Sequence, residues 1–367
     1  MDGSARIGSR LVASNTSKNL IAKAKRANPA LVKDAIQRRV QVGLARRGIL
    51  VTRIDEEGRR YFEVGHDSDV PLPPGAEAEL RADNPRLTEL RAAYDKLDYP
   101  SAVPTQWSDD FLSKNLSLAW FRGDNAYVWQ LRLFTGGART RNFLAMLDIE
   151  SRDRLGLFSK LKEDGLFGAF TFDFGERTVS RDLLDSINEI SYLDEHMGLS
   201  SIPDATILDI GAGYGRLAHR IDEGLDNVVA YDCTDGVPIS TFLCEYYTRF
   251  RGLSEAVRVV PLSEIDTLRE SYTLAVNVHS FSEQSLASIT WWFEQIAQRD
   301  IEWVLIVPNT QGVLLSTESD GSRRDFMPIV LGAGYELADH RQIYSTQEMC
   351  DMIGLQDEFY LFKRVGA

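Results

Sequence analysis

The segment TILDIGAGYGRLA at residues 206–218 constrains the fold more than any other part of the chain. An apolar run ends in Asp209, glycines alternate at Gly211, Gly213 and Gly215, and a helical pattern follows. Because glycine has no Cβ, the chain can turn sharply there and a ligand can approach the backbone. A helix that begins at such a turn directs unpaired N–H groups toward the ligand. The segment therefore predicts a strand, a ligand-binding loop and a helix in immediate succession.

Two classes of ligand suit this arrangement, and the spacing separates them. The dinucleotide fingerprint G-x-G-x-x-G requires a third glycine where this chain has Arg216. S-adenosylmethionine has no phosphate, and its ammonium group favours a nearby carboxylate such as Asp209. The run 227–232 reads as a second strand that ends in Asp232, where an acid can accept both ribose hydroxyls. The loop thus favours a cationic amino-acid ligand, although plain packing of the glycines and a solvated turn acid at 232 remain alternatives.

Composition and charge describe a globular protein with an unusual amino-terminal segment. The chain has 367 residues, 44% hydrophobic and 26% charged, and no run of about 18 apolar residues. Three scattered cysteines and the absence of a secretory pattern favour the cytoplasm. Residues 1–50 hold eleven Lys and Arg against two Asp, a net +9, so the total of −13 leaves −22 on the remainder. The acidic body argues against nucleic acid, whereas the basic arm suits an anionic membrane surface, an acidic partner or the body itself.

The order of elements predicts an α/β fold. Alternating strands and helices begin at residue 206 and indicate a parallel sheet with helices on both faces. Two late strand-like runs, 335–344 and 358–364, predict an antiparallel insertion that completes seven strands. We expect three regions: a basic arm with a small hairpin and a Pro-rich linker at 1–83, a mainly helical, aromatic-rich region at 84–200, and the sheet domain at 201–367. The first region includes a predicted helix at 29–47, and the second includes one at 139–162.

At this point the chain resembles a known family. The segments that carry the resemblance are LLDSINEISYL, ILDIGAGYGRLA, VAYDCTDGVPISTFLCEYY, LAVNVHSFSEQS and, upstream, WFRGDNAYVWQLR. They are similar to class I S-adenosylmethionine-dependent methyltransferases, and among these to the sugar O-methyltransferases, over roughly residues 84–364. The resemblance implies a Rossmann-like seven-stranded sheet, mostly parallel with its last strand antiparallel, and S-adenosylmethionine as the cofactor. It implies that Asp209, Gly211, Gly213 and Gly215 hold the amino-acid part of the cofactor and that Asp232 holds the ribose.

Two further cofactor contacts are expected from the same resemblance. Asn277 opens a segment similar to the Asn-x-x-Ser-Phe-x-Glu stretch of the family and is assigned to the cofactor. After the third strand many such enzymes have an acid or amide for the adenine amine, whereas this chain has Ser263 as its only polar candidate. The pattern thus departs from the family at the adenine position.

Methyl transfer to a hydroxyl requires alignment with the methyl donor and removal of a proton. His279 follows the fourth strand, where ligands meet the carboxyl ends of the strands, and is predicted to be the general base. Glu283 is predicted to assist by orienting His279 or by binding sugar hydroxyls, with capping of the next helix as the structural alternative. The acceptor is expected to contact Arg122, Tyr127, Trp129 and Gln130, a mixture of aromatic and polar groups, although core packing also explains the aromatics. No spacing of His, Asp or Glu predicts a metal site.

These observations predict a cytoplasmic S-adenosylmethionine-dependent O-methyltransferase that acts on a hydroxyl of a sugar or glycosylated metabolite. A methyltransferase for another small molecule or a protein is the alternative enzyme. A non-catalytic scaffold with the same fold is the alternative of a different class. We expect a small-molecule partner and no nucleic acid, and we leave open both peripheral contacts through the basic arm and a homo-oligomer.

Overall fold

The computed structural model describes residues 40, 43, 44, 47, 70–123, 125, 128 and 137–366. The chain divides into two compact units, Met1–Arg59 and Arg60–Ala367. The fold and the site belong to the second unit, and the predicted region boundaries after residues 83 and 200 fall inside it. The predicted hairpin at 49–64 and most of the predicted helix at 29–47 lie outside the described residues.

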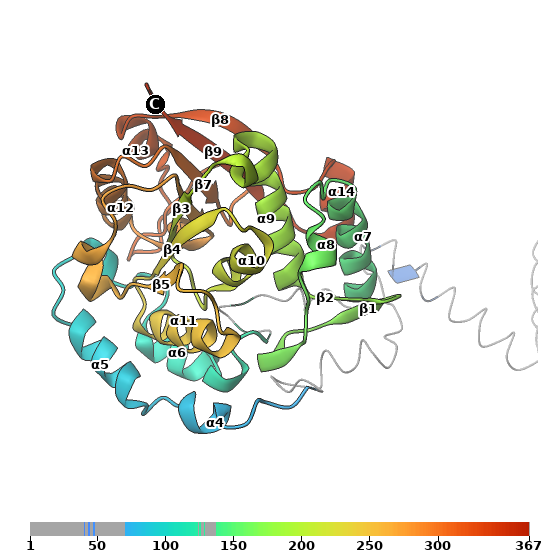
Figure 1. Cartoon of the computed structure of the whole chain (residues 1–367), viewed down its shortest axis with the longest axis horizontal. Helices are drawn as coiled ribbons and strands as arrows, with labels where there is room; N and C mark the ends of the chain where they lie inside the picture. Colours follow the sequence, from blue (N-terminus) through green and yellow to red (C-terminus); the bar gives the residue numbers. More distant parts are fainter. Residues whose placement is uncertain are drawn as a thin grey trace, which may run out of the picture. The chain divides into compact units, whose positions relative to one another are not determined.

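A seven-stranded sheet forms the centre of the second unit (Figure 1). Its spatial order is β5-β4-β3-β6-β7-β9-β8, and only β9 runs antiparallel to its neighbours. The strands are β3 (Ala205–Ile210), β4 (Val228–Thr234), β5 (Val257–Val259), β6 (Leu274–Val278), β7 (Trp303–Val307), β8 (Tyr335–Gln342) and β9 (Glu358–Arg364). The predicted mostly parallel sheet with an antiparallel last strand is confirmed. Because the strand order reverses between β3 and β6, a crevice is expected at their carboxyl ends.

Helices cover both faces of this sheet because side chains alternate along each buried strand. Ile207 of β3 belongs to one hydrophobic cluster, and the next residue, Leu208, belongs to the other. The first cluster includes residues of α7 (Ala138–Glu150), α8 (Leu157–Lys160), α9 (Arg181–Met197), α10 (Arg216–Gly224) and α14 (Gln347–Ile353) (Figure 1). The second includes residues of α4 (Ala76–Glu79), α5 (Pro85–Tyr94), α6 (Asp109–Asn115), α11 (Pro238–Arg251), α12 (Leu286–Gln298) and α13 (Met327–Gly332).

Short elements connect these layers. A two-stranded antiparallel hairpin is formed by β1 (Phe172–Phe174) and β2 (Arg177–Val179). The 3-10 helices are η1 (Pro100–Ala102), η2 (Leu118–Trp120), η3 (Leu166–Gly168), η4 (Leu199–Ser201), η5 (Leu262–Thr267) and η6 (Ser280–Glu283). Among the described residues no helix is both long and apolar enough to cross a membrane.

The single helix predicted at 139–162 is wrong, because the structure has two helices there. The helix α7 ends at Glu150, and α8 begins only after Gly156, whose φ of 67° is left-handed. The carboxylate of Asp153 accepts hydrogen bonds from the backbone N–H groups of Leu157 and Phe158, 2.9 and 3.0 Å away. An acid that satisfies the first N–H groups of a helix favours a new start there.

The sequence RDLLDSINEISYLDEHM predicts a helix at 181–197, and α9 has these bounds and well-defined ends. The Ser180 hydroxyl accepts a hydrogen bond from the Leu183 backbone N–H, and Gly198 closes the helix with a φ of 67°. Serine at the N-cap and a left-handed glycine at the C-terminus are the residues these positions favour. The first turns of α9 are thereby fixed in place, and they form one wall of the site described next.

Candidate functional site

A cavity of about 380 Å³ opens at the carboxyl ends of β3, β4 and β6. This is the place where the reversal of strand order predicts a ligand. Its walls come from residues 101–107, the start of α9, the glycine loop 211–214, residues 235–237, residues 278–284 and the carboxylate of Asp357. Segments far apart in the sequence therefore line one cavity, which is large enough for a small ligand.

The three glycines of the loop all have left-handed backbones. The φ angles are 77° at Gly211, 59° at Gly213 and 85° at Gly215, which side chains with a Cβ rarely adopt. A Cβ on Gly211 would lie 2.3 Å from the side chain of Ser280. The absence of a side chain thus lets the turn after β6 pack directly on the turn after β3.

Asp209 is a buried carboxylate at the end of β3 and lines the cavity. Its Oδ2 accepts a hydrogen bond of 2.8 Å from the Tyr231 hydroxyl. Among the described residues, no cationic group lies within ion-pair distance of it. Burial raises the pKa of Asp209 to about 7, against a smaller lowering by the Tyr231 hydrogen bond. A carboxylate held in this way is suited to a cationic group of a ligand.

The structure does not place Asp232 at the cavity. Its carboxylate is fully buried, and Arg258 donates to it from Nε at 3.0 Å and from Nη2 at 2.8 Å. The Tyr272 hydroxyl donates a third hydrogen bond of 2.5 Å. The prediction mistook the end of the strand, because β4 continues to Thr234 rather than ending near residue 231.

Asp235 takes the position that was expected for Asp232. It follows β4 directly and lines the cavity. Its Oδ2 accepts from the Gly213 backbone N–H at 3.1 Å, and its Oδ1 accepts from that of Val237 at 2.8 Å. Burial raises the pKa of Asp235 to about 7 against these two hydrogen bonds. The acid at the strand end is therefore tied to the glycine loop by a hydrogen bond.

Two other residues assigned to the cofactor also lie away from the cavity lining. Asn277 is fully buried, donates from Nδ2 to the Ile210 carbonyl at 2.7 Å and accepts from the Phe281 N–H at 2.8 Å. It therefore joins the ends of β3 and β6 and orients the following turn. Ser263 is exposed in η5 and does not line the cavity. Neither side chain is placed to contact a ligand in the cavity.

His279 lines the cavity in a strained backbone conformation with a φ of 66°. Its backbone N–H donates to the Val307 carbonyl at 2.7 Å, which anchors the residue to β7. Its Nε2 lies 3.3 Å from Oδ2 of Asp357, which precedes β9. Burial alone would lower the pKa of His279, but the hydrogen bond and charge of Asp357 raise it above its ordinary value. Because strained backbone conformations of non-glycine residues cluster at functional sites, His279 is a candidate functional residue.

Glu283 lies on the same turn and also lines the cavity. The Trp107 indole donates from Nε1 to its Oε2 at 2.6 Å, and the Thr105 hydroxyl donates to its backbone carbonyl at 2.5 Å. Burial raises the pKa of Glu283, partly offset by the Trp107 hydrogen bond. These contacts bring residues 105–107 against the turn that carries His279. The structure therefore brings together the two predicted catalytic residues and an aromatic residue that was not predicted.

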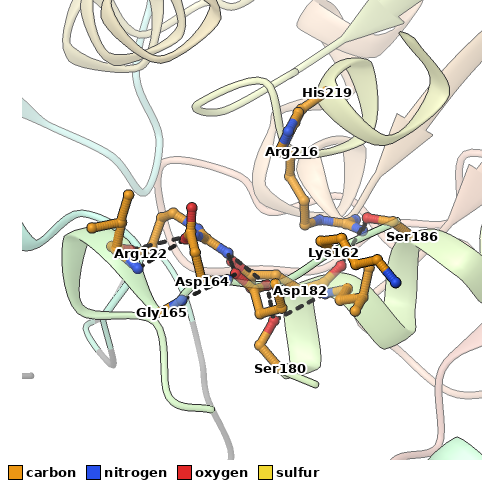
Figure 2. A network of polar contacts seen from close by, with 12 residues as sticks. Arg122, Lys162, Asp164, Gly165, Ser180, Asp182, Ser186, Arg216 and His219 are labelled. Atoms are coloured by element: carbon orange, nitrogen blue, oxygen red, sulfur yellow. Dashed lines mark hydrogen bonds and ion pairs between the residues drawn. The ribbon is translucent and has the colours of Figure 1, made fainter. Parts of the chain in front are cut away.

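Of the four residues predicted to contact the acceptor, the structure describes Arg122 alone. Arg122 is 1% exposed and binds Glu163 and Asp182 in a buried network, so it does not line the cavity (Figure 2). Because carboxylates enclose the guanidinium, Arg122 is not placed to contact an acceptor in the cavity. Tyr127, Trp129 and Gln130 lie outside the described residues. Val128, which stands between two of them, does line the cavity.

The ionisable groups of the cavity wall are mostly acidic. Six carboxyl groups and two guanidiniums line it: Asp182, Asp185, Asp209, Asp235, Glu283 and Asp357 against Arg181 and Arg216. Within the described part of the chain no cluster of three His, Cys, Asp or Glu is arranged to hold a metal ion. The wall therefore favours a cationic organic ligand and disfavours a pyrophosphate.

The site residues missed from the sequence include Asp235, Trp107, Asp182 and Asp357. Asp235 had a usable signal, because Cys233 and Thr234 continue the strand pattern past Asp232 and make Asp235 the first residue after the strand. Trp107, Asp182 and Asp357 had none, because each reaches the cavity only through packing of distant segments. Sequence spacing carries no information about such contacts.

Comparisons with known proteins gave matches among solved structures alone. Neither a protein-family model nor a curated protein sequence matches the chain. Among solved structures, the mitomycin 7-O-methyltransferase MmcR is 14% identical with a TM-score of 0.35, and the match covers 50% of this chain and 57% of that one. An S-adenosylmethionine-dependent methyltransferase from Clostridium acetobutylicum is 13% identical, with 49% and 91% covered and a TM-score of 0.35.

A third solved structure, the [4+2]-cyclase SpnF, is 12% identical, with 61% and 95% covered and a TM-score of 0.38. These three structures are two methyltransferases and a cyclase, so similarity of fold does not identify one reaction.

Proposed function

We propose that the protein is an S-adenosylmethionine-dependent methyltransferase acting on a hydroxyl group. The observation that carries the proposal is the buried Asp209 carboxylate, placed beside the left-handed glycine loop in a cavity with an acidic wall. S-adenosylmethionine carries an ammonium and a sulfonium, so it gains from this wall, whereas a dinucleotide pyrophosphate is repelled by it. The charged groups that line the cavity therefore fit this cofactor.

Three side chains are positioned to hold the parts of the cofactor. Asp209 would accept from its ammonium, and Asp235 would accept from its ribose hydroxyls. Arg216, the first residue of α10, lines the cavity and would bind the carboxylate. Glu189 holds the Arg216 guanidinium through contacts of 2.8 and 3.0 Å, so its direction is fixed before a ligand enters.

The His279–Asp357 pair provides a base for the acceptor hydroxyl. The bound cofactor would supply the methyl group as a sulfonium electrophile. Nε2 of His279 lies 3.3 Å from Oδ2 of Asp357, so the carboxylate would keep the proton of the neutral ring on Nε2 and leave Nδ1 unprotonated. Nδ1 would take the hydroxyl proton, and the carboxylate would stabilise the imidazolium that forms.

A sugar or glycosylated metabolite is the acceptor class we propose. Trp107 lines the cavity with its indole N–H directed to Glu283. An aromatic ring next to a carboxylate offers an apolar surface for sugar C–H groups and an acceptor for sugar hydroxyls. The proposal of a sugar rests on this pair and on the resemblance of residues 277–283 to sugar O-methyltransferases.

Incubation with methyl-labelled S-adenosylmethionine and a panel of nucleotide sugars, glycosides, phenols and proteins tests this function. We expect label in glycosides and nucleotide sugars. Transfer to phenols or proteins alone would refute the sugar acceptor but retain the enzyme. Cofactor binding with no transfer to any member of a broad panel would favour the scaffold.

The affinity for S-adenosylmethionine is expected to rise between pH 6 and 8. Below its raised pKa of about 7 Asp209 is protonated and has no charge for the ammonium; above that pKa it is ionised and the affinity reaches a plateau. Calorimetry in buffers of different ionisation enthalpy should detect proton release near pH 6.5. Asp209→Asn should weaken binding at pH 8. The variant should reduce the proton release without abolishing it, because burial also raises the pKa of Asp235 to about 7. An affinity in wild type that does not change with pH would contradict the role of Asp209.

Asp235→Ala is expected to weaken the cofactor by roughly 10-fold or more, since hydrogen bonds to a charged group contribute about 1.5–3 kcal/mol. The matched control is Asp232→Asn at the acid that was first predicted for the ribose. It should lower the free energy of unfolding, because it disturbs the buried contacts with Arg258 and Tyr272, but keep the affinity. Calorimetry and urea unfolding measure the two effects. A loss of cofactor affinity in Asp232→Asn with unchanged affinity in Asp235→Ala would instead assign the ribose contact to Asp232.

A further inference from the structure

A buried ionic network lies behind the cavity wall and is built around Glu163. Its side chain is fully buried and accepts from Nη2 of Arg122 at 2.9 Å, Nη2 of Arg220 at 3.1 Å and the Ser180 hydroxyl at 2.5 Å. Burial alone would raise the pKa of Glu163, but the two guanidiniums hold it well below its usual range. Figure 2 shows Arg122 meeting Ser180 and Asp182, which both lie at the start of α9.

The network reaches the cavity through Asp182 and Tyr214. Arg122 donates from Nε to Oδ2 of Asp182 at 3.2 Å, and the Tyr214 hydroxyl donates to the same oxygen. Asp182 belongs to the first turn of α9 and Tyr214 to the glycine loop, and both line the cavity. One carboxylate oxygen therefore ties the glycine loop to the network.

Four side chains form the buried part of this network. Arg122 and Arg220 offset Glu163 and Asp182, and each of the four is at most 6% exposed, while the more exposed Asp164 and Glu223 each approach one of the guanidiniums at 3.5 Å. A buried charge that loses its partner is strongly unfavourable, so the four groups have one favourable arrangement. The loop itself, with three glycines, has no such preference of its own. Its position must come from contacts such as that of Tyr214.

We propose that Tyr214, Asp182, Arg122 and Glu163 form a positioning network that holds the glycine loop in the conformation that binds the cofactor. The proposal rests on the proposed function, because it assumes that the loop binds S-adenosylmethionine. Tyr214 connects the loop to the network through its hydrogen bond to Asp182. Arg122 and Glu163 hold Asp182 in place and so influence cofactor binding without contacting the cofactor. Preorganisation of this kind improves affinity because the loop has less freedom to lose on binding.

The first test is Tyr214→Phe with Tyr247→Phe as its matched control. Tyr247 is equally buried, and its hydroxyl bonds to Nδ1 of His219 at 3.1 Å, away from the cavity lining. Both variants lose one buried hydroxyl contact and should lose comparable thermal stability. Only Tyr214→Phe should raise the dissociation constant and the KM for S-adenosylmethionine, on the order of 10-fold. The kcat at saturating cofactor should stay within about threefold of wild type in both variants.

The second test is a double-mutant cycle with Glu163→Gln, which changes a residue that does not line the cavity. We expect this variant to weaken the cofactor by a similar factor and the double variant to show less than the product of the two effects. If Glu163→Gln does not fold, the comparison of Tyr214→Phe with Tyr247→Phe decides the matter alone. Cofactor affinity within twofold of wild type in Tyr214→Phe would overturn the positioning role. Wild-type protein that binds no S-adenosylmethionine would overturn the proposed function instead.

Discussion

Replacement of His279 by asparagine is expected to lower kcat by on the order of 10²–10⁴-fold while the cofactor affinity stays similar. Asparagine retains a polar side chain near the Asp357 carboxylate, 3.3 Å from Nε2 in the native protein, but it cannot take a proton from the acceptor. Single-turnover measurement of methyl transfer separates the chemical step from product release. A variant with near-native turnover would show that the histidine is structural, and Glu283 would become the candidate base.

The pH profile provides a control for this first prediction. Activity of wild type should rise with pH through the pKa of His279, which Asp357 raises above the ordinary value, because only the neutral ring accepts a proton. Asp357→Asn removes the charge that raises this pKa, so the midpoint of the profile should move to lower pH. An unchanged midpoint would mean that a different group controls the rate.

Replacement of Gly211 by alanine is expected to have the largest effect on both stability and activity among the loop positions. The added Cβ would lie 2.3 Å from Ser280, and the φ of 77° is unfavourable for any residue with a side chain. Together these effects are expected to lower the free energy of unfolding by about 2–5 kcal/mol. Because Ser280 follows His279, a shift of this turn should also reduce kcat on the order of 10²-fold.

Gly175→Ala is the matched control for this second prediction. Gly175 lies in the turn between β1 and β2 with a φ of 67°, and nothing lies within 4 Å of an added Cβ. Gly175→Ala should lower the free energy of unfolding only by the about 1–2 kcal/mol that a left-handed backbone costs a residue with a Cβ, and the variant should keep full activity. Urea unfolding and kinetic assays compare the two variants. Equal effects at both glycines would show that the Gly211–Ser280 approach is unimportant.

Both predictions depend on contacts between segments that are distant in the chain. The glycine loop and the turn after β6 are more than sixty residues apart, yet a missing Cβ at Gly211 brings them together. Asn277 reinforces this contact by donating to the Ile210 carbonyl. The residue expected to bind the cofactor is thus one that joins the two turns.

The order of elements and the location of the site were predictable from the sequence. Alternating hydrophobic runs and helical patterns indicated the succession of strands and helices, because periodicity reflects which faces are buried. The antiparallel last strand was implied by the family resemblance. The glycines and Asp209 were found because special backbone conformations and strand-end acids leave local signals. His279 was found because the carboxyl ends of parallel strands meet at one edge of the sheet.

The tertiary structure alone decided which polar groups face the cavity and which are buried in ion pairs. Asp232 and Asp235 are three residues apart, and only the true end of β4 separates the acid paired with Arg258 from the acid at the cavity. Arg122 was predicted to contact the acceptor, but Glu163 and Asp182 enclose it. Asp357 reaches His279 from a segment near the carboxyl terminus. Local sequence determines backbone conformation and burial patterns, whereas partners of charged side chains depend on long-range packing, which short-range spacing does not encode.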